Sequence, residues 1–563
     1  MSTAPSPTAI QQALVAAFEQ HRAGRFAQAE ASYRQVLAAD PNHFDALHLL
    51  GSLMFAMGQN DDAIVAFERA VLARPDAAAD TWNNLGFCLI TKNDFHRAES
   101  AFRRAIELNP KLPNAYANLG NALQRQARVE EAIAALRAAL TLNPNLRVAH
   151  QNLLVALNYA PAHTPQDVYA EHVRWAEQHA NHLGDKAPPH ANERDETRRL
   201  RVAYVSPDFR RHSVAFFIEP LLAAHDREQV EVVCYSEVEQ PDATTARIKP
   251  LADVWRQTRG VSDDRFAQIV REDRVDILVD LAGHTAGNRL LAFARRPAPV
   301  QVTYLGYPNT TGMAAMDCRI TDAHADPPGV TDAFHTEQLI RLPRTAWCYR
   351  PPAEAPRVAD APPSATNGLV TFASFNKLAK ISSPCLDAWA ELLRMTPRSR
   401  MIVKATALGD PILRQRLATE FANRGVKAHR VDVLGPVGPT ADHLSTYARV
   451  DVALDTFPYH GTTTTCDALH MGVPVVTLAG QTHVSRVGVS LLHAVGLDDL
   501  VAQTPQQYVE TAAKLAADHE RLSRLRTTLR GQMRSSPLGD ATSLARDVEA
   551  AYRQCWQRWC RCS

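Results

Sequence analysis

The sequence predicts a multidomain protein: an all-α superhelix of repeated helix pairs, followed by an α/β region with two doubly wound parallel sheets. Prolines recur at intervals of 34 or 35 residues near the start of the chain, at Pro41, Pro75, Pro110 and Pro144. From Leu200 onward, apolar strands alternate with amphipathic helices, which is typical of a parallel sheet covered on both faces. A Pro- and Ala-rich stretch, 351–367, precedes a second such alternation that begins at Leu369.

The composition is that of a globular protein with several domains: 563 residues, of which 46% are hydrophobic and 21% are charged. A formal net charge of +1 gives no reason to expect nucleic acid or an anionic membrane as a partner. The nine cysteines lack paired metal spacing, so we expect reduced thiols in a cytoplasmic protein. The sequence begins without a signal-peptide pattern, and no apolar run approaches the ~20 residues that a membrane span requires.

Each repeat carries small residues at fixed offsets. These are Ala29, Ala63, Ala98 and Ala132, with Tyr33, Phe67, Phe102 and Leu136 four positions later. Leu-Gly pairs mark the first helix of three successive repeats, and a small residue there lets paired helices approach closely. The pattern resembles the tetratricopeptide repeat. Such repeats stack into a superhelix with a concave groove, because each one buries its apolar face only against its neighbours.

Three asparagines occupy the same offset of successive repeats, one residue before the leucine of the first helix. They are Asn84, Asn118 and Asn152. A single Asn on a helix is most often a solvated surface residue, but three in register on the groove-lining helix predict a ladder. Because an amide side chain both donates and accepts hydrogen bonds, the ladder suits an extended peptide backbone of any sequence.

The chain after the repeats divides by composition into five further parts. A segment with one helical piece near Asp167–His179 is expected to cap the repeats and lead into the α/β region. At the end of the chain, an amphipathic helix is predicted over Ala541–Trp559, with Val548, Tyr552 and Trp556 on one face. The predicted boundaries are 1–158 for the repeats, 159–199 for the capping segment, 200–350 for the first lobe, 351–367 for a linker, 368–535 for the second lobe and 536–563 for the terminal helix.

The segment from Leu454 to Thr477 has the pattern of a nucleotide-phosphate site. A strand, Val450–Leu454, leads into a turn at Pro458 and Gly461, and four threonines then open a helix before a second strand, Val473–Thr477. This order places hydroxyls and unpaired backbone N–H groups at the carboxyl edge of a parallel sheet, where such sheets bind ligands. The helix dipole and the amides favour an anion there. The alternative is an ordinary Thr-capped helix.

Four further loops are expected to face a cleft between the two lobes. Their sequences are SPDFRRHS (206–213), AGHTAGNR (282–289), TYLGYPNTTG (303–312) and FNKLAKIS (375–382). The first carries His212, the second His284, and the fourth Lys377 and Lys380. A single His after a strand is most often a capping or surface residue. The shared position of these side chains at strand carboxyl ends makes them candidates for catalysis.

These motifs, with GPVGPTADHLS (435–445) and GTTTTCDALHMGVPVVT (461–477), follow the repeats in an order that resembles the protein O-linked N-acetylglucosamine transferases of glycosyltransferase family 41. The resemblance covers nearly the whole chain and implies a GT-B catalytic region of two Rossmann-like lobes. It also implies transfer of GlcNAc from UDP-GlcNAc to Ser or Thr of intracellular proteins, with inversion and without a metal or other cofactor. The sequence agrees in having no close Asp-x-Asp pair for a divalent cation.

The resemblance also implies residue roles. His212 matches the proposed base or acceptor-side catalytic residue, with His284 as the next candidate. Lys380 matches the lysine that holds the donor diphosphate, a role suited to a reaction without a metal because the leaving group gains charge. The implied donor site is completed by His443 on the nucleotide base, Asp467 at the ribose, Leu305 and Gly306 over the sugar, and Lys377, Pro439, Thr440, Gly461, Thr462, Thr463 and Thr464 around the nucleotide and its phosphates.

Three positions depart from the animal members of the family. Lys377 replaces an amide, Thr462 replaces a histidine, and Thr440 replaces a lysine. The run FPYHGTTTTCDAL (457–469) instead resembles the plant branch, some of whose members use a GDP-fucose donor. Two alternatives to GlcNAc transfer therefore stand: protein O-fucosylation from GDP-fucose, and a repeat scaffold with an inactive transferase region. The presence of Lys380, Asp467, His212 and the threonine run argues against the scaffold.

Overall fold

The computed structural model describes residues 7–76, 79–185 and 187–562 of the chain. It divides into two compact units, 1–156 and 157–563, so the boundary lies two residues before the predicted end of the repeats. None of the helices in the described residues combines the length and the apolar character of a membrane-spanning segment.

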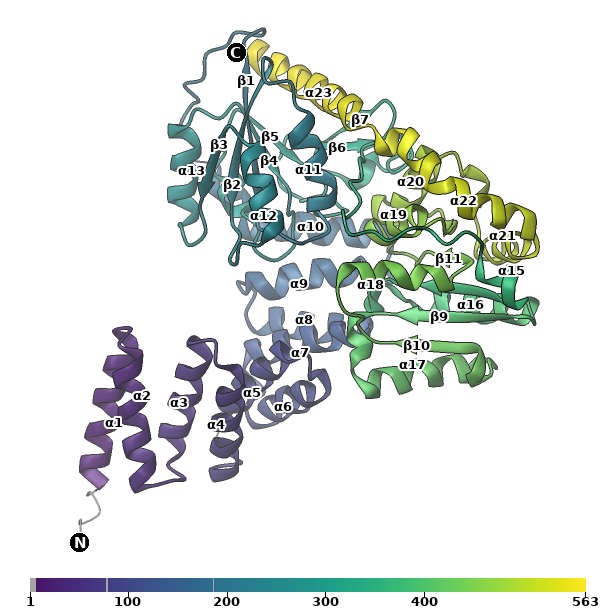
Figure 1. The fold of residues 1–563 in the computed structure, drawn as a ribbon. Helices are drawn as coiled ribbons and strands as arrows, with labels where there is room; N and C mark the ends of the chain where they lie inside the picture. Colours follow the sequence, from purple (N-terminus) through teal and green to yellow (C-terminus); the bar gives the residue numbers. More distant parts are fainter. Residues whose placement is uncertain (1–6, 77–78, 186, 563) are drawn as a thin grey trace. The chain divides into compact units, whose positions relative to one another are not determined.

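The first unit consists of helix pairs (Figure 1). Pro41, Pro75, Pro110 and Pro144 lie in the turns between successive pairs. Glycines hold the helices of three pairs close together: a Cβ atom on Gly51, Gly86 or Gly120 would come within 2.8 Å of the facing side chain. Those facing side chains are Phe67, Phe102 and Leu136, the large residues of the repeat pattern. The helices are α1 Pro7–Arg22, α2 Phe26–Ala39, α3 Phe44–Ala56, α4 Asn60–Ala73, α5 Ala79–Thr91, α6 Phe95–Leu108, α7 Pro113–Arg125, α8 Val129–Leu142 and α9 Arg147–Leu157.

The second unit opens with α10 (Pro165–His179), which starts at a capping box made by Thr164 and Asp167. The first lobe follows as a parallel sheet in the order β3-β2-β1-β4-β5-β6-β7. Its strands are β1 Leu200–Ser206, β2 Val230–Ser236, β3 Val254–Gln257, β4 Ile277–Asp280, β5 Val300–Thr303, β6 Cys318–Asp322 and β7 Gln338–Leu342. Its helices are α11 Ala215–Ala224, α12 Ala243–Ile248, α13 Asp263–Glu272 and α14 Leu290–Ala294.

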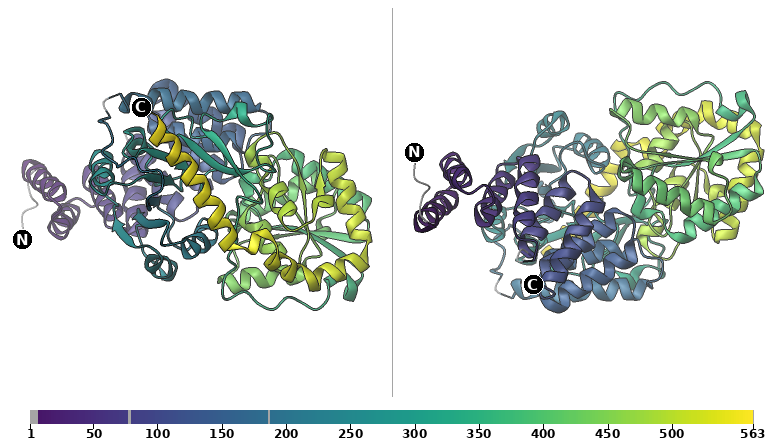
Figure 2. Two further views of the ribbon diagram at one scale, coloured as in Figure 1. Left: turned by 90° about the horizontal axis from the view of Figure 1, so that it is seen from above. Right: turned by 90° about the horizontal axis from the view of Figure 1, so that it is seen from below.

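The second lobe is a parallel sheet in the order β10-β9-β8-β11-β12-β13, with helices on both of its faces (Figure 2). Both predicted doubly wound sheets are therefore confirmed. The strands are β8 Val370–Ser374, β9 Ser399–Lys404, β10 Val431–Leu434, β11 Val452–Leu454, β12 Val475–Leu478 and β13 Val501–Ala502. The helices are α15 Pro363–Asn367 in the linker, then α16 Ser383–Met395, α17 Pro411–Asn423, α18 Thr440–Ser445, α19 Thr463–His470, α20 Val487–Ala494, α21 Pro505–Ala517 and α22 His519–Ser535.

The terminal helix α23 (Ala541–Arg561) returns to the first lobe, as the yellow ribbon in Figure 1 shows. Val548, Tyr552 and Trp556 are all buried, which confirms the predicted apolar face. The hydroxyls of Tyr552 and Tyr204 on β1 are hydrogen bonded at 3.2 Å. The Trp556 indole donates to the Asp195 carbonyl at 2.9 Å.

Buried polar contacts join the two lobes on the side of β6. His483 of the second lobe is hydrogen bonded to the Asp326 carboxylate at 2.7 Å. The Ser490 hydroxyl on α20 donates to the Asp322 carboxylate at the end of β6, at 2.5 Å. These contacts hold the carboxyl edges of the two sheets in a fixed relation, which matters because the candidate site draws on both edges.

Candidate functional site

The turn that follows β11 is held by one buried carboxylate, Asp455. One of its oxygens accepts the backbone N–H groups of Gly461 at 2.7 Å and Thr456 at 2.9 Å. The other accepts the Thr477 hydroxyl on β12 at 2.9 Å. The predicted turn therefore exists, and its backbone is tied to both neighbouring strands.

Helix α19 begins within the threonine run, as predicted. Thr462 is the residue before the helix, but its side chain makes no capping hydrogen bond, so the alternative of an ordinary Thr-capped helix is wrong. The Thr464 hydroxyl donates to the Asn376 side chain at 2.9 Å. The Thr463 hydroxyl is buried and has no hydrogen-bond partner among the described residues. A helix N-terminus with an unused hydroxyl suits a phosphate group.

Lys380 lies beside this turn. It ends a single 3-10 turn, Leu378–Lys380, and its ammonium donates to the His460 carbonyl at 2.7 Å. The same Nζ atom is 4.1 Å from the centre of the Tyr459 ring. Burial lowers the pKa of Lys380 to about 7, with Lys377 lowering it further and Asp455 opposing the shift. A bound diphosphate would favour the charged form of this lysine.

A second polar cluster lies at the start of α19 and the end of β9. The Asp467 carboxylate accepts the Tyr349 hydroxyl and is 3.6 Å from His443 Nε2. Lys404 contacts Nδ1 of the same His443, and its Nζ is 4.7 Å from the centre of the Phe375 ring. Burial lowers the pKa of Lys404 to about 8, with Asp467 opposing the shift. Asp467 and His443 therefore lie together, as their expected roles at the ribose and the base require.

His212, the histidine of the first lobe that is predicted to be catalytic, has an acidic neighbour. His212 Nδ1 accepts the backbone N–H of Val214 at 3.3 Å and is 3.4 Å from the Asp208 carboxylate. Burial lowers the pKa of His212 and raises that of Asp208, while each partner's charge opposes the other's shift. A lowered pKa keeps the imidazole neutral near pH 7. Nδ1 accepts the Val214 N–H in this structure, so the neutral ring has its proton on Nε2. Nε2 carries the lone pair that a general base requires in the other tautomer, in which Asp208 accepts Nδ1–H.

The loop after β5 is the predicted lip over the sugar. Leu305 has a φ of +63°, which is unusual for a residue with a side chain. A Cβ atom on Gly306 would come 1.9 Å from the Leu281 carbonyl, so this position accepts only glycine. The Tyr307 hydroxyl is 2.8 Å from His172 on α10 and accepts the Asn158 side chain at 2.8 Å. Hydrogen bonds from the segment that follows the repeats thus hold this loop in place.

His284 lies under this loop. Its side chain is buried, with Nε2 2.8 Å from the Thr311 carbonyl and its ring 4.5 Å from that of Trp175. Its ring also packs on Tyr307 at 5.3 Å. These contacts favour a role in positioning the loop, and catalysis by His284 stays a prediction.

The remaining predicted donor residues are at the rim of the second lobe. Lys377 is exposed, and its charge acts on both Asp208 and His212. Pro439 precedes α18, and Thr440 is the first residue of that helix, which carries His443. The contribution of these rim residues to nucleotide binding stays a prediction.

In the repeats, the asparagines make contacts with one another that the ladder prediction did not include. Asn118 on α7 donates to Asn83 on α5 at 2.9 Å, and Asn83 is also 3.4 Å from Asn84. Asn152 lies on α9 at the same offset and is half-buried. Binding of a peptide by these residues stays a prediction.

Sequence reasoning missed four residues of the site: Asp208, Tyr349, Asn376 and Lys404. Asp208 could have been found, because it stands four residues before His212 within the same motif. Tyr349 and Lys404 come from a linker start and a strand end with no motif. No group of three or more His, Cys, Asp or Glu side chains in the part of the chain that the structure describes is placed to hold a metal ion. Metal independence stays a prediction.

Comparisons with known proteins agree with this geometry. The model of glycosyl transferase family 41 matches residues 142–349 and 363–548, and tetratricopeptide repeat models match 20–81, 79–112 and 113–146. A solved structure, an O-GlcNAc transferase mutant of Thermobaculum terrenum, is 39% identical with a TM-score of 0.81 over 98% of each chain. The predicted order of repeats and GT-B lobes is therefore confirmed.

Two curated plant proteins are also similar. The chain is 45% identical over 411 residues to a "Probable UDP-N-acetylglucosamine--peptide N-acetylglucosaminyltransferase SPINDLY" of Solanum lycopersicum, covering 72% of this chain and 44% of the relative. It is 31% identical over 374 residues to a protein of Arabidopsis thaliana with the same enzymatic name and the designation SEC, covering 64% and 38% respectively. The chain thus spans less than half the length of these curated relatives.

Proposed function

Because the chain belongs to glycosyltransferase family 41, we propose that it transfers N-acetylglucosamine from UDP-GlcNAc to Ser or Thr hydroxyls of intracellular proteins. The observation that carries the proposal is a pair of groups at the carboxyl edges of the two sheets, with the charge of Lys377 acting on both His212 and Lys380. The second lobe offers Lys380 and the N-terminus of α19 to a diphosphate. The first lobe offers His212 with Asp208 to an acceptor hydroxyl.

The reaction follows from these positions as a single displacement. In the tautomer that donates Nδ1–H to Asp208, His212 Nε2 takes the proton of the Ser or Thr hydroxyl while that oxygen forms a bond to the anomeric carbon. The bond from the anomeric carbon to the diphosphate oxygen breaks, and UDP leaves with the electron pair. Because attack and departure are on opposite faces, the anomeric configuration inverts. Lys380 and the α19 amides stabilise the charge that develops on the diphosphate, so the reaction proceeds without a metal ion.

Nucleotide recognition is assigned to the second polar cluster. Asp467 accepts hydrogen bonds from the ribose hydroxyls, and its present contact with the Tyr349 hydroxyl keeps it oriented. His443 packs on the base from α18. Leu305 and Gly306 close over the sugar, a close approach that the absence of a Cβ atom on Gly306 permits.

A nucleotide screen tests the donor. A ligand that binds only the folded protein raises its melting temperature, so UDP should raise it more than GDP does. Transfer of labelled sugar from UDP-GlcNAc to a protein acceptor should then exceed transfer from GDP-fucose. The opposite order on both assays would make the chain a protein O-fucosyltransferase, which the resemblance of FPYHGTTTTCDAL to the plant branch favours as the second candidate. No stabilisation by either nucleotide would indicate an inactive scaffold.

The acceptor assignment needs a separate test. We propose that protein acceptors lie along the repeats, held through their backbones by Asn84, Asn118 and Asn152. Replacing all three by Ala should lower transfer to protein acceptors, while UDP affinity and hydrolysis of the donor stay unchanged. Equal losses in all three assays would mean that the substitutions only destabilise the repeats. Asn83→Ala is the matched control variant: it removes the side chain that Asn118 contacts and keeps the three asparagines of the ladder.

A further inference from the structure

Two tyrosine rings are stacked directly beside the proposed catalytic lysine. The rings of Tyr159 and Tyr459 have centres 4.8 Å apart and planes inclined by 24°. The Lys380 ammonium is 4.1 Å from the centre of the Tyr459 ring. Tyr159, Tyr459 and Lys380 therefore form a stack. It connects the start of the second unit to the turn that follows β11.

The backbone that carries Tyr459 is fixed by the residue after it. The His460 backbone N–H donates to the Val484 carbonyl at 3.1 Å. Its ring accepts the Gly488 N–H on Nδ1 at 3.0 Å, so the proton is on Nε2, which donates to the Leu478 carbonyl at 2.9 Å. The Thr456 hydroxyl also donates to the Tyr459 carbonyl at 2.7 Å. The ring of Tyr459 therefore projects from a turn whose backbone is held on several sides.

The residue before Tyr159 is fixed by hydrogen bonds to the loop that follows β5. The side chain of the preceding residue, Asn158, donates to the Tyr307 hydroxyl at 2.8 Å and accepts from Asn309 at 2.8 Å. Both partners belong to the glycine-bounded loop over the sugar position. Because Asn158 and Tyr159 are consecutive, the same segment hydrogen-bonds to this loop and stacks against the Tyr459 ring.

We propose that Tyr459, supported by Tyr159, is a positioning residue that holds the Lys380 ammonium in place against the donor diphosphate. The inference rests on the proposed role of Lys380. An ammonium has three N–H donors: the His460 carbonyl takes one, and the face of the Tyr459 ring attracts the charge on another side. One donor remains for a phosphate oxygen, and the two contacts fix its direction.

The ring also affects the protonation of Lys380. Burial lowers the pKa of this lysine to about 7, Lys377 lowers it further, and Asp455 raises it. His460, beside the same contact, is neutral because burial lowers its pKa. An aromatic face stabilises a cation and not a neutral amine. Removing the ring should therefore lower the pKa of Lys380 still more, and binding that needs the cation should fail at a lower pH.

The test is the pH dependence of UDP affinity between about pH 5 and 9 in the whole 563-residue chain, with single-turnover transfer measured alongside. In wild type, affinity should fall as pH rises above about 7, because the free protein loses the Lys380 proton. In Tyr459→Leu, this fall should begin about half to one pH unit lower, the shift expected for losing one cation–π contact. Tyr459→Phe keeps the ring face and should restore the wild-type profile. Tyr169→Leu, on α10, is the control for loss of a half-buried ring elsewhere.

Two results would overturn the proposal: an unshifted profile in Tyr459→Leu, or a profile in Tyr459→Phe that matches Tyr459→Leu. If Tyr459→Leu does not fold, Tyr159→Leu takes its place and should give the same direction of shift with a smaller size. The affinity measurement uses UDP alone. A wild-type protein that binds UDP with this pH profile but transfers no sugar would therefore refute the proposed function and leave the positioning role intact.

Discussion

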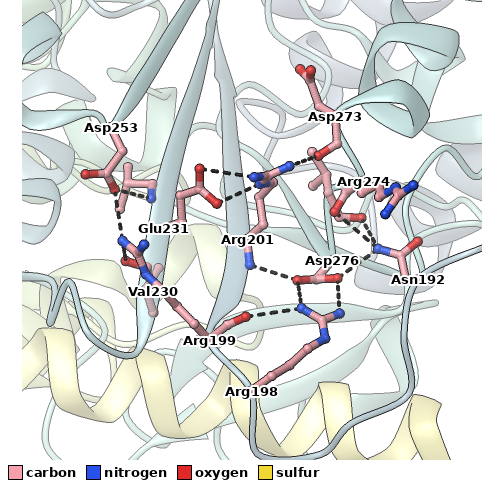
Figure 3. A network of polar contacts seen from close by, with 12 residues as sticks. Asn192, Arg198, Arg199, Arg201, Val230, Glu231, Asp253, Asp273, Arg274 and Asp276 are labelled. Carbon is pink, nitrogen blue, oxygen red and sulfur yellow. Dashed lines mark hydrogen bonds and ion pairs between the residues drawn. The ribbon is translucent and has the colours of Figure 1, made fainter.

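The amino edge of the first sheet and the carboxyl edge of the second use charged groups in opposite ways. Asp276, just before β4, accepts two hydrogen bonds from the Arg198 guanidinium at 2.6 and 2.7 Å. It also accepts the Asn192 side chain and the Arg201 backbone N–H, both at 2.8 Å (Figure 3). Every oxygen of this buried carboxylate is therefore occupied by protein groups.

The carboxyl edge of the second sheet contains polar groups that are not fully hydrogen bonded. The Thr463 hydroxyl is buried without a partner in the described chain, and the Lys380 ammonium donates one hydrogen bond although it has three N–H donors. Burial lowers the pKa of Lys380 to about 7 and that of Lys404 to about 8. An unsatisfied buried group destabilises the unliganded fold, and we propose that a bound nucleotide satisfies it here. The amino edge should therefore govern stability, and the carboxyl edges should govern binding and catalysis.

The largest expected effect belongs to the carboxyl edge of the first lobe. His212→Ala should lower single-turnover transfer by ~10² to 10⁴ if the imidazole acts as the general base. UDP affinity measured by calorimetry should stay within about twofold, because His212 is on the lobe opposite α19. Asp208→Asn keeps the imidazole and should give a smaller loss. Full transfer by His212→Ala would exclude it as the base and leave His284 as the next candidate.

At the amino edge, Asp276→Ala should reduce stability and not catalysis. It leaves the Arg198 guanidinium without its carboxylate in a half-buried position that α23 covers through Trp556, 4.6 Å away. Breaking a buried ion pair typically lowers the free energy of unfolding by about 3 to 5 kcal/mol, which is measured as a lower melting temperature. Asp360→Ala removes a highly exposed pair with Arg357 and should leave melting unchanged. Equal melting of both variants would contradict the role assigned to this edge.

Lys380→Ala removes a charge that matters most as the diphosphate leaves. Losing one such donor should lower turnover by ~10² to 10³, while UDP affinity falls less because the α19 amides and Asp467 remain. The fall in UDP affinity above pH 7 should disappear, since that dependence comes from the Lys380 proton. Lys514→Ala, an exposed lysine of α21, is the control and should behave as wild type. A persisting pH dependence in Lys380→Ala would assign the titration to another group.

Much of this arrangement was predictable from sequence because it depends on local patterns. The threonine run opens a helix, the alternation of apolar segments gives both sheets, and Val548, Tyr552 and Trp556 repeat at helical spacing. Each of these features depends on residues that are close together in the sequence. The fit of Gly51 against Phe67 followed from the repeat pattern in the same way.

What the sequence could not reveal depends on contacts between distant segments. Tyr349 reaches Asp467 across 118 positions, and Tyr159 reaches Tyr459 across the whole of the first lobe. Lys404 ends an ordinary strand, and only the fold places it beside His443. His284 looked like a cleft residue because it follows β4, but α10 covers it with Trp175. No periodicity encodes such pairings.

The smallest expected effects come from two threonines of α19, and they test the comparison between the two sheet edges. The Thr463 hydroxyl has no partner within the described residues, whereas the Thr465 hydroxyl donates to the Gly461 carbonyl at 3.0 Å. Thr463→Val removes an unsatisfied buried group, so it should raise the stability of the unliganded protein by about 1 kcal/mol and weaken UDP binding about 5- to 10-fold.

Thr465→Val, in contrast, leaves the Gly461 carbonyl without its donor and should lower stability by about 1 kcal/mol. Both substitutions replace a hydroxyl by a methyl group, two positions apart on α19, so the changes in helix propensity and volume cancel between them. Melting without nucleotide and calorimetry with UDP, run on both variants, therefore isolate the hydrogen bond. If Thr463→Val melts below wild type and binds UDP normally, the hydroxyl serves the fold, and this edge is not reserved for a ligand.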